Sequence, residues 1–165
     1  MADSASTLLK VACDNAYDKN PDSCSHAAWD VIKARVVANE PHRQANGMID
    51  NMTSNWMEVT VDKAYELAQA GTVVIGGLKG TPHGHVIVIY PGDKLESGGY
   101  DYYYPKLKNM LKMRSHGKYP PCMSTSNGSW PGAKSKGDKT VWDPWGNDVV
   151  FAKVKFWTPK TKENR

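Results

Sequence analysis

Cys24 and His85 have the residue types and the settings that nucleophilic catalysis requires. Cys24 follows a loop rich in Asn, Pro, Asp and Ser and opens a run with apolar residues every three to four positions, which predicts a helix from Cys24 to about Val37. Asp22 or Ser23 is well placed as its N-cap. Because a helix start carries partial positive charge and free N–H groups, it should lower the pKa of the thiol. Cys24 is therefore the predicted nucleophile, with plain core packing as the alternative.

A nucleophilic thiol needs a base, and histidine is the usual one. His85 directly precedes an apolar run of strand-forming residues, so a polar side chain at that position calls for a reason. His26 lies two residues after Cys24 on the same helix and cannot face the same side. His42 and His116 fall in poorly defined segments, where solvated side chains are expected. His85 is the predicted base, with a structural histidine as the alternative.

The length and composition predict one soluble globular domain that spans residues 1–165. The hydrophobic content is 40% and the charged content 23%, and no run of 18 apolar residues predicts a membrane-spanning helix. The first residues, Met-Ala-Asp-Ser-Ala-Ser-Thr, do not read as a secretory signal peptide, so synthesis in the cytosol is expected. The net charge of +4 favours acidic partners or simply provides a solubilising surface.

The chain has three cysteines, which is too few for a disulfide framework. A bridge between Cys13 and Cys122 is geometrically conceivable, and the sequence leaves it open.

The predicted elements are segregated, with helices first and strands afterwards. This order favours an α+β fold with an antiparallel sheet over alternating βαβ units. Apolar periodicity and breaker residues predict helices at 7–16, 24–37, 47–57 and 61–70, and strands at 72–75, 85–90, 122–126 and 148–157.

Several motifs resemble the type VI secretion amidase effectors, which belong to the NlpC-like and CHAP group of papain-like peptidoglycan amidases. The Cys-Ser pair at a helix start and the Gly-His-Val strand are shared by the whole group. The narrower motifs lie at 76–80 (Gly-Gly-Leu-Lys-Gly), 46–50 (Asn-Gly-Met-Ile-Asp) and 118–122 (Lys-Tyr-Pro-Pro-Cys). The resemblance covers roughly residues 8 to 130.

The resemblance implies a papain-like (NlpC-type) fold, N-terminal helices packed on an antiparallel sheet, and no cofactor or metal. Cys24 would attack a stem-peptide amide, with the bond between D-glutamate and diaminopimelate favoured over the diaminopimelate–D-alanine cross-link. His85 would shuttle the proton. Position matching places Cys122 near the third catalytic position, with core packing as its alternative. Ser25 and His83 are the expected substrate contacts.

The resemblance also implies a biological setting. Such effectors are made in the cytoplasm without a signal peptide and are injected by the type VI secretion apparatus into the periplasm of rival cells. The producing cell carries a periplasmic immunity protein that plugs the active-site groove. Neither nucleic acid nor insertion into a membrane belongs to this setting.

Two other readings compete with a cysteine amidase. His83 and His85 form a His-x-His pair that could present two imidazoles to zinc, but the upstream His-x-x-x-Asp of lysostaphin-like peptidases is absent. Alternatively, aromatic and basic residues interleave over 100–118, as in a non-enzymatic module that binds cell wall or nucleic acid.

Overall fold

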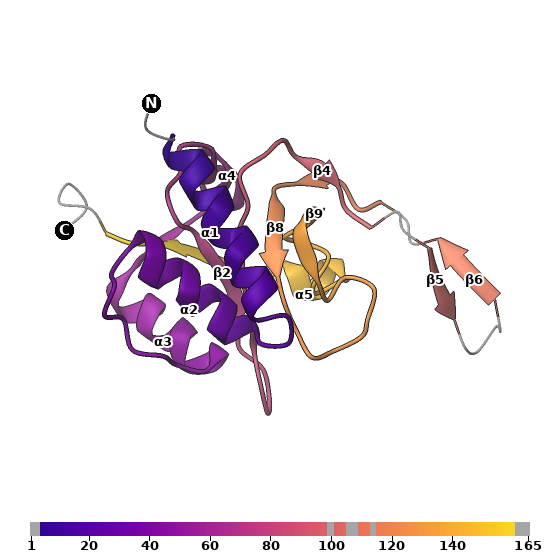
Figure 1. Ribbon diagram of the computed structural model, residues 1–165. Helices are drawn as coiled ribbons and strands as arrows, with labels where there is room; N and C mark the ends of the chain where they lie inside the picture. The colour runs from indigo at the N-terminus through magenta and orange to yellow at the C-terminus, as the bar shows by residue number, and fades with distance from the viewer. Residues whose placement is uncertain (1–3, 99–100, 105–108, 113–114, 161–165) are drawn as a thin grey trace.

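A computed structural model describes residues 4–98, 101–104, 109–112 and 115–160 of the chain (Figure 1). The helices are α1 (Ala5–Lys19), α2 (Cys24–Arg35), α3 (Ala45–Asn55), α4 (Val61–Gln69) and α5 (Asp148–Phe151). The strands are β1 (Met57–Val59), β2 (Ile75–Leu78), β3 (His85–Ile89), β4 (Leu95–Glu96), β5 (Asp101–Tyr104), β6 (Asn109–Lys112), β7 (Lys118–Tyr119), β8 (Pro121–Ser124), β9 (Ser135–Thr140) and β10 (Lys155–Thr158).

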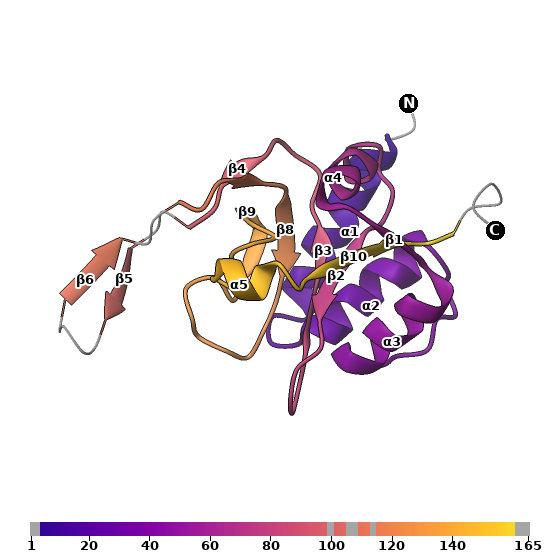
Figure 2. The same ribbon diagram turned by 180° about the vertical axis from the view of Figure 1, so that it is seen from behind.

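Six of the strands form the central sheet, in the order β1-β10-β2-β3-β8-β9, and every neighbouring pair is antiparallel. β3 is an inner strand between β2 and β8, with His85 opposite Leu78 and Ile89 opposite Cys122. β4 pairs with β7 and β5 with β6, and the β5–β6 hairpin lies apart from the central sheet (Figures 1 and 2). The predicted α+β class with an antiparallel sheet is confirmed.

Two adjacent glycines in β2 allow both faces of the sheet to be covered closely. A Cβ on Gly77 would lie 3.0 Å from Ile49 Cδ1 of α3, and a Cβ on Gly76 would lie 2.8 Å from Phe156 Cε1 of β10. Phe156 in turn packs edge-on against Phe151 of α5. The helices α1 to α3 thus lie on one side of the sheet and α5 on the other (Figure 2).

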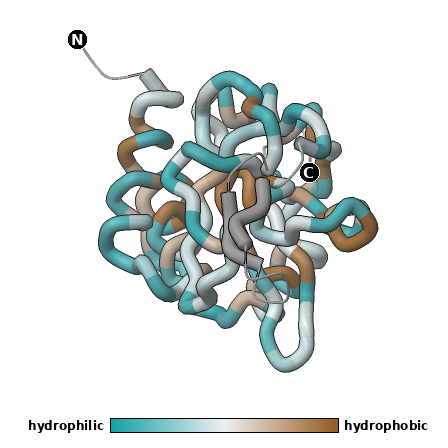
Figure 3. The backbone as a smooth tube through the Cα atoms, turned by 90° about the vertical axis from the view of Figure 1, so that its right-hand side faces the viewer, coloured by the Kyte–Doolittle hydropathy of each residue, from teal (hydrophilic) through white to brown (hydrophobic). Residues whose placement is uncertain are grey.

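The core forms where α2 and β3 meet under this helical layer. The predicted apolar face of α2 is buried, and so is all of β3 after its first residue. In the view of Figure 3, hydrophilic residues predominate along the outer parts of the chain. Within the described residues, no helix combines the length and the apolarity needed to cross a membrane.

Two predicted strands differ from the structure. The strand expected at 72–75 instead runs from Ile75 to Leu78. It includes Gly76 and Gly77, because a side chain at either position would clash with the residues packed on the two faces of the sheet. The strand expected at 148–157 is divided: Asn147 Oδ1 accepts from the N–H groups of Val149 and Val150 and caps the short helix α5. Only β10 remains of that strand.

Candidate active site

Cys24 is the first residue of α2, as its sequence setting predicts. Ser23 is the N-cap, with extended backbone (φ −138°, ψ 106°), and its Oγ accepts from the N–H of His26 at 3.3 Å. The cap ends the preceding loop at a fixed point and leaves the thiol at the edge of the core, half-buried and free of any disulfide.

Two opposing effects act on the Cys24 thiol. Burial raises its pKa, while the backbone N–H groups of Val86, Ser25 and Cys24 itself lower it, and the net pKa is above the ordinary value. The lowering expected from N–H groups at the helix start is present, but desolvation of the thiolate outweighs it. The resting nucleophile is a neutral thiol that needs a base. The N–H of Val86 belongs to β3, so the thiol lies beside the strand that His85 begins.

His85 is held as a neutral base with a defined tautomer. Its Nε2 lies 3.0 Å from Ser124 Oγ, and Ser124 Oγ donates to the Ala133 carbonyl at 2.8 Å. Since a hydroxyl has one proton, Nε2–H must donate to Ser124, which leaves Nδ1 as the basic nitrogen. Burial lowers the pKa of His85 to about 4, so the imidazole is uncharged at neutral pH.

Two tryptophans enclose the imidazole. The rings of Trp130 and Trp145 meet His85 edge-on, with centroids 6.3 and 5.6 Å away. Trp130 Nε1 donates to the Pro144 carbonyl at 2.9 Å, which ties the loop after β8 to the segment that carries Trp145. These rings supply much of the apolar surround that keeps His85 uncharged.

Cys122 does not take part in this arrangement. It is fully buried on β8 opposite Ile89, four residues along β3 from His85, and its thiol donates to the Thr140 carbonyl at 3.4 Å. The oxygen beside the imidazole belongs to Ser124, two residues further along the same strand. The structure therefore places Ser124, and not Cys122, beside the His85 imidazole.

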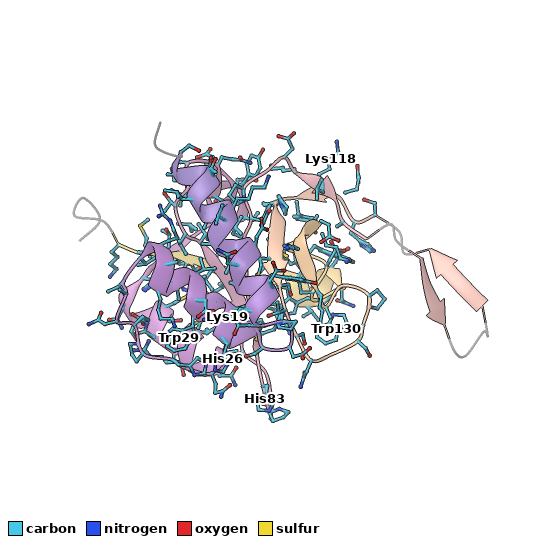
Figure 4. All side chains as sticks on the ribbon, in the orientation of Figure 1. Lys19, His26, Trp29, His83, Lys118 and Trp130 are labelled. Atoms are coloured by element: carbon cyan, nitrogen blue, oxygen red, sulfur yellow. The ribbon has the colours of Figure 1, made fainter. Side chains whose placement is uncertain are left out.

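Cys24 and His85 line one open groove of about 740 Å³. Both expected substrate contacts also line it: Ser25 is buried, with its Oγ 3.2 Å from His42 Nε2, and His83 is exposed in the β2–β3 loop (Figure 4). The remaining lining residues come from the loop before α2, the start of α3, the β2–β3 loop and the segments after β8: Asp22, Ser23, Gln44, Ala45, Asn46, Leu78, Lys79, Gly80, Pro82, Gly84, Ser126, Asn127, Trp130 and Trp145.

The β2–β3 loop is clamped by the first turns of α3. Asn46 Nδ2 donates to the Gly80 carbonyl at 2.8 Å, and the Gly80 N–H donates to Asn46 Oδ1 at 3.1 Å. A Cβ on Gly84 would lie 2.3 Å from that same Oδ1. One turn further along α3, Asp50 pairs with Lys79 at 2.8 Å. Asn46 is not among the predicted site residues, although the motif at 46–50 that contains it resembles the amidase effectors.

Other sequence predictions meet the structure only in part. The residues from 100 to 114 in the aromatic and basic stretch lie outside those whose side chains the structure describes. No three His, Cys, Asp or Glu side chains gather into a potential metal site within the described ranges. Cys13 and Cys122 are both buried free thiols.

Comparison with known proteins identifies one similar enzyme. No family model matches the chain. The chain is similar to the peptidoglycan amidase Tse1 of Pseudomonas aeruginosa, with 34% identity over 98 residues. The match covers 54% of this chain and 63% of Tse1, so it spans less than two thirds of that relative. The similarity confirms the resemblance to peptidoglycan amidases that the motifs indicated.

Proposed function

We propose that the protein is a single-domain, papain-like cysteine amidase that hydrolyses stem-peptide amide bonds of peptidoglycan. The observation that carries the proposal is the shared groove, in which a free thiol at a helix start lies against the strand that begins with a neutral, half-buried histidine. The similarity to the amidase Tse1 supports peptidoglycan as the substrate.

The proposed reaction begins with proton transfer from Cys24 Sγ to the free Nδ1 of His85. The thiolate adds to the amide carbonyl carbon, and the oxyanion that forms accepts from N–H groups at the start of α2, including that of Cys24. Collapse of this intermediate breaks the C–N bond as His85 returns the proton to the leaving amine. Water, deprotonated by His85, then hydrolyses the thioester and restores the thiol.

Ser124 is the proposed third member of the site. By accepting from Nε2–H it fixes the tautomer that leaves Nδ1 basic, and it stabilises the imidazolium that forms during the reaction. A hydroxyl serves this role without adding a negative charge beside the ring. Ser25 and His83 remain the proposed substrate contacts along the groove.

The proposed bond is that between D-glutamate and diaminopimelate. The proposed setting is delivery by a type VI secretion apparatus into the periplasm of a rival cell, with a cognate immunity protein in the producer. Expression with a periplasmic signal peptide should then lyse cells, while cytosolic expression should be harmless. Equal toxicity in both compartments would indicate a cytosolic target such as nucleic acid.

The decisive experiment is digestion of purified peptidoglycan followed by mass spectrometry of the fragments. Cys24→Ala should abolish digestion, because it removes the nucleophile and little else. Cys13→Ala is the matched control: that cysteine is fully buried in α1 and does not line the groove, so activity should remain. Undiminished digestion by the Cys24 variant contradicts the mechanism, and fragments cut at the cross-link contradict the assigned bond.

A further inference from the structure

A stacked pair of histidines lies beside the start of the nucleophile helix. The rings of His26, in the first turn of α2, and His42, in the connection between α2 and α3, are 3.9 Å apart at an interplanar angle of 19°. Trp29 meets both rings edge-on, with centroids 6.1 and 5.2 Å away, and lies next to His26 in Figure 4. His42 is half-buried in this cluster, so its expected solvated position is wrong.

Each ring of the pair holds one of the two serines that flank Cys24. His26 Nδ1 lies 2.7 Å from Ser23 Oγ, and His42 Nε2 lies 3.2 Å from Ser25 Oγ. Ser23 is the N-cap of α2, and the backbone N–H of Ser25 is one of the groups that favour the Cys24 thiolate. The pair is thus in direct hydrogen-bonding contact with both chain neighbours of Cys24.

Charged groups surround the pair on both of the elements that form it. On α2, Lys33 Nζ lies 3.4 Å from the Trp29 ring centroid and 3.3 Å from Asp30 Oδ1. On the connection, Arg43 pairs with Glu40 at 2.6 Å, and each of these two cations therefore has a carboxylate partner.

The surroundings disfavour a charge on His42. Burial, then the neighbouring His26, then Lys33 lower the pKa of His42 below its ordinary value. Protonation of both rings would place two positive charges face to face across 3.9 Å, beside the positive end of a helix. Acidification therefore weakens the stack and the two serine contacts that depend on it.

We propose that the His26–His42 pair positions the nucleophile: while uncharged it holds Ser23 and Ser25 on either side of Cys24, and double protonation releases them. The pair contacts neither the thiol nor the basic nitrogen of His85 through any described hydrogen bond, so its role is positioning and not proton transfer. The consequence is an acid limb of the rate profile that belongs to the pair and is separate from the limb caused by protonation of His85.

This inference rests on the proposed function. Two measurements allow the positioning role and the proposed function to be tested separately. One is the pH profile of peptidoglycan digestion. The other is the rate of Cys24 alkylation by iodoacetamide, followed by mass spectrometry of the Cys24 peptide, which requires no peptidoglycan.

The informative variants keep or remove the hydrogen bond and the charge separately. His42→Gln keeps a neutral hydrogen-bonding group for Ser25 but cannot gain a proton. It should therefore retain the rate at neutral pH while its acid limb moves toward that of His85, and His26→Gln should shift the limb in the same direction. His42→Ala removes the hydrogen bond as well and should lower both digestion and alkylation about three- to tenfold at neutral pH, as expected for one neutral hydrogen bond.

The matched control is His116→Gln, since His116 also stacks on a neighbouring ring but does not line the groove. It should leave both pH profiles unchanged. Wild-type profiles of both readouts in all three pair variants would overturn the positioning role even if peptidoglycan is digested. Conversely, shifted alkylation profiles in a protein that digests no peptidoglycan would support the positioning role and overturn the proposed function.

Discussion

His85 and His116 each lie against a tryptophan, and each has one ring nitrogen within hydrogen-bonding distance of a side-chain oxygen. The two oxygens belong to different chemical groups. His85 meets the hydroxyl of Ser124 at 3.0 Å inside the groove. His116 stacks on Trp142 at 4.5 Å, and its Nδ1 lies 3.0 Å from a carboxylate oxygen of Asp148 near the surface.

The two oxygen partners differ in charge. Burial lowers the pKa of His85 to about 4, and its partner adds no charge to counter this effect. Hydrogen bonds from His116 and Trp142 lower the pKa of Asp148, so that pair favours a carboxylate beside the imidazole. The hydroxyl partner therefore leaves the effect of burial on His85 uncompensated, whereas the partner of His116 is a carboxylate whose charged form is favoured.

The largest expected difference between the two sites is in catalysis. His85→Gln should lower peptidoglycan digestion at neutral pH by at least about 10²- to 10⁴-fold, the usual contribution of a general base. His116→Gln should change it less than about twofold, since that ring lies outside the groove. A turbidity assay on purified walls compares the two variants. A comparable loss of digestion rate in both would show that the two histidines do not differ in catalysis.

Exchanging the partner should convert one site toward the other. In Ser124→Asp, a carboxylate beside Nε2 should raise the pKa of His85 by about one to three units. Titration of the imidazole by NMR measures this shift directly, and the acid limb of the digestion rate should move up with it. Ser124→Asn adds a side chain of similar size without the charge and is the control. An unshifted titration would show that burial alone sets the state of His85.

Alanine substitutions should distinguish the role of Ser124 from that of Cys122. Ser124→Ala should lower the digestion rate about tenfold, because Nε2–H loses its partner and the tautomer is no longer fixed. Cys122→Ala should leave the rate within about twofold and lower the free energy of unfolding by about 1 kcal/mol, the typical effect of a small buried deletion. If Cys122→Ala proved the more damaging to catalysis, the original assignment of the third residue would regain support.

The smallest effect concerns stability against pH. The folded-state pKa of His85, about 4, lies below the ordinary histidine value near 6.5, so the unfolded chain takes up this proton first as pH falls. Stability should decline through that window, and His85→Gln should make the decline shallower. Asp148→Asn should lower stability at neutral pH and flatten the decline at more acidic pH, where the wild-type Asp148 carboxylate gains a proton. Urea unfolding at a series of pH values tests both expectations.

Local signals in the sequence were sufficient for the parts of the site that depend on one element. A capping serine before an apolar period located the start of α2, and a lone polar residue before Val86 marked the start of β3. Both proposed catalytic residues, Cys24 and His85, lie at such element boundaries, which explains why the sequence could single them out.

The parts that depend on register between distant strands could not be predicted. Whether Cys122 or Ser124 meets His85 depends on how β8 pairs with β3, and both residues point to the same side of that strand. The net pKa of Cys24 likewise depends on burial by the assembled fold, not on its place in the helix. β9 was missed because its sequence is polar, and Gly137, at φ +84°, lies against the Tyr90 ring there.

The clamp between Asn46 and the backbone of Gly80 has a consequence for how such a groove can diversify. The clamp grips main-chain atoms at the base of the β2–β3 loop, so the side chains of Thr81, Pro82 and His83 beyond it do not hold His85 in place. Under the proposed function, residues at the tip of the loop can therefore change without loss of the proposed chemistry, and new preferences for neighbouring wall fragments can evolve at that rim.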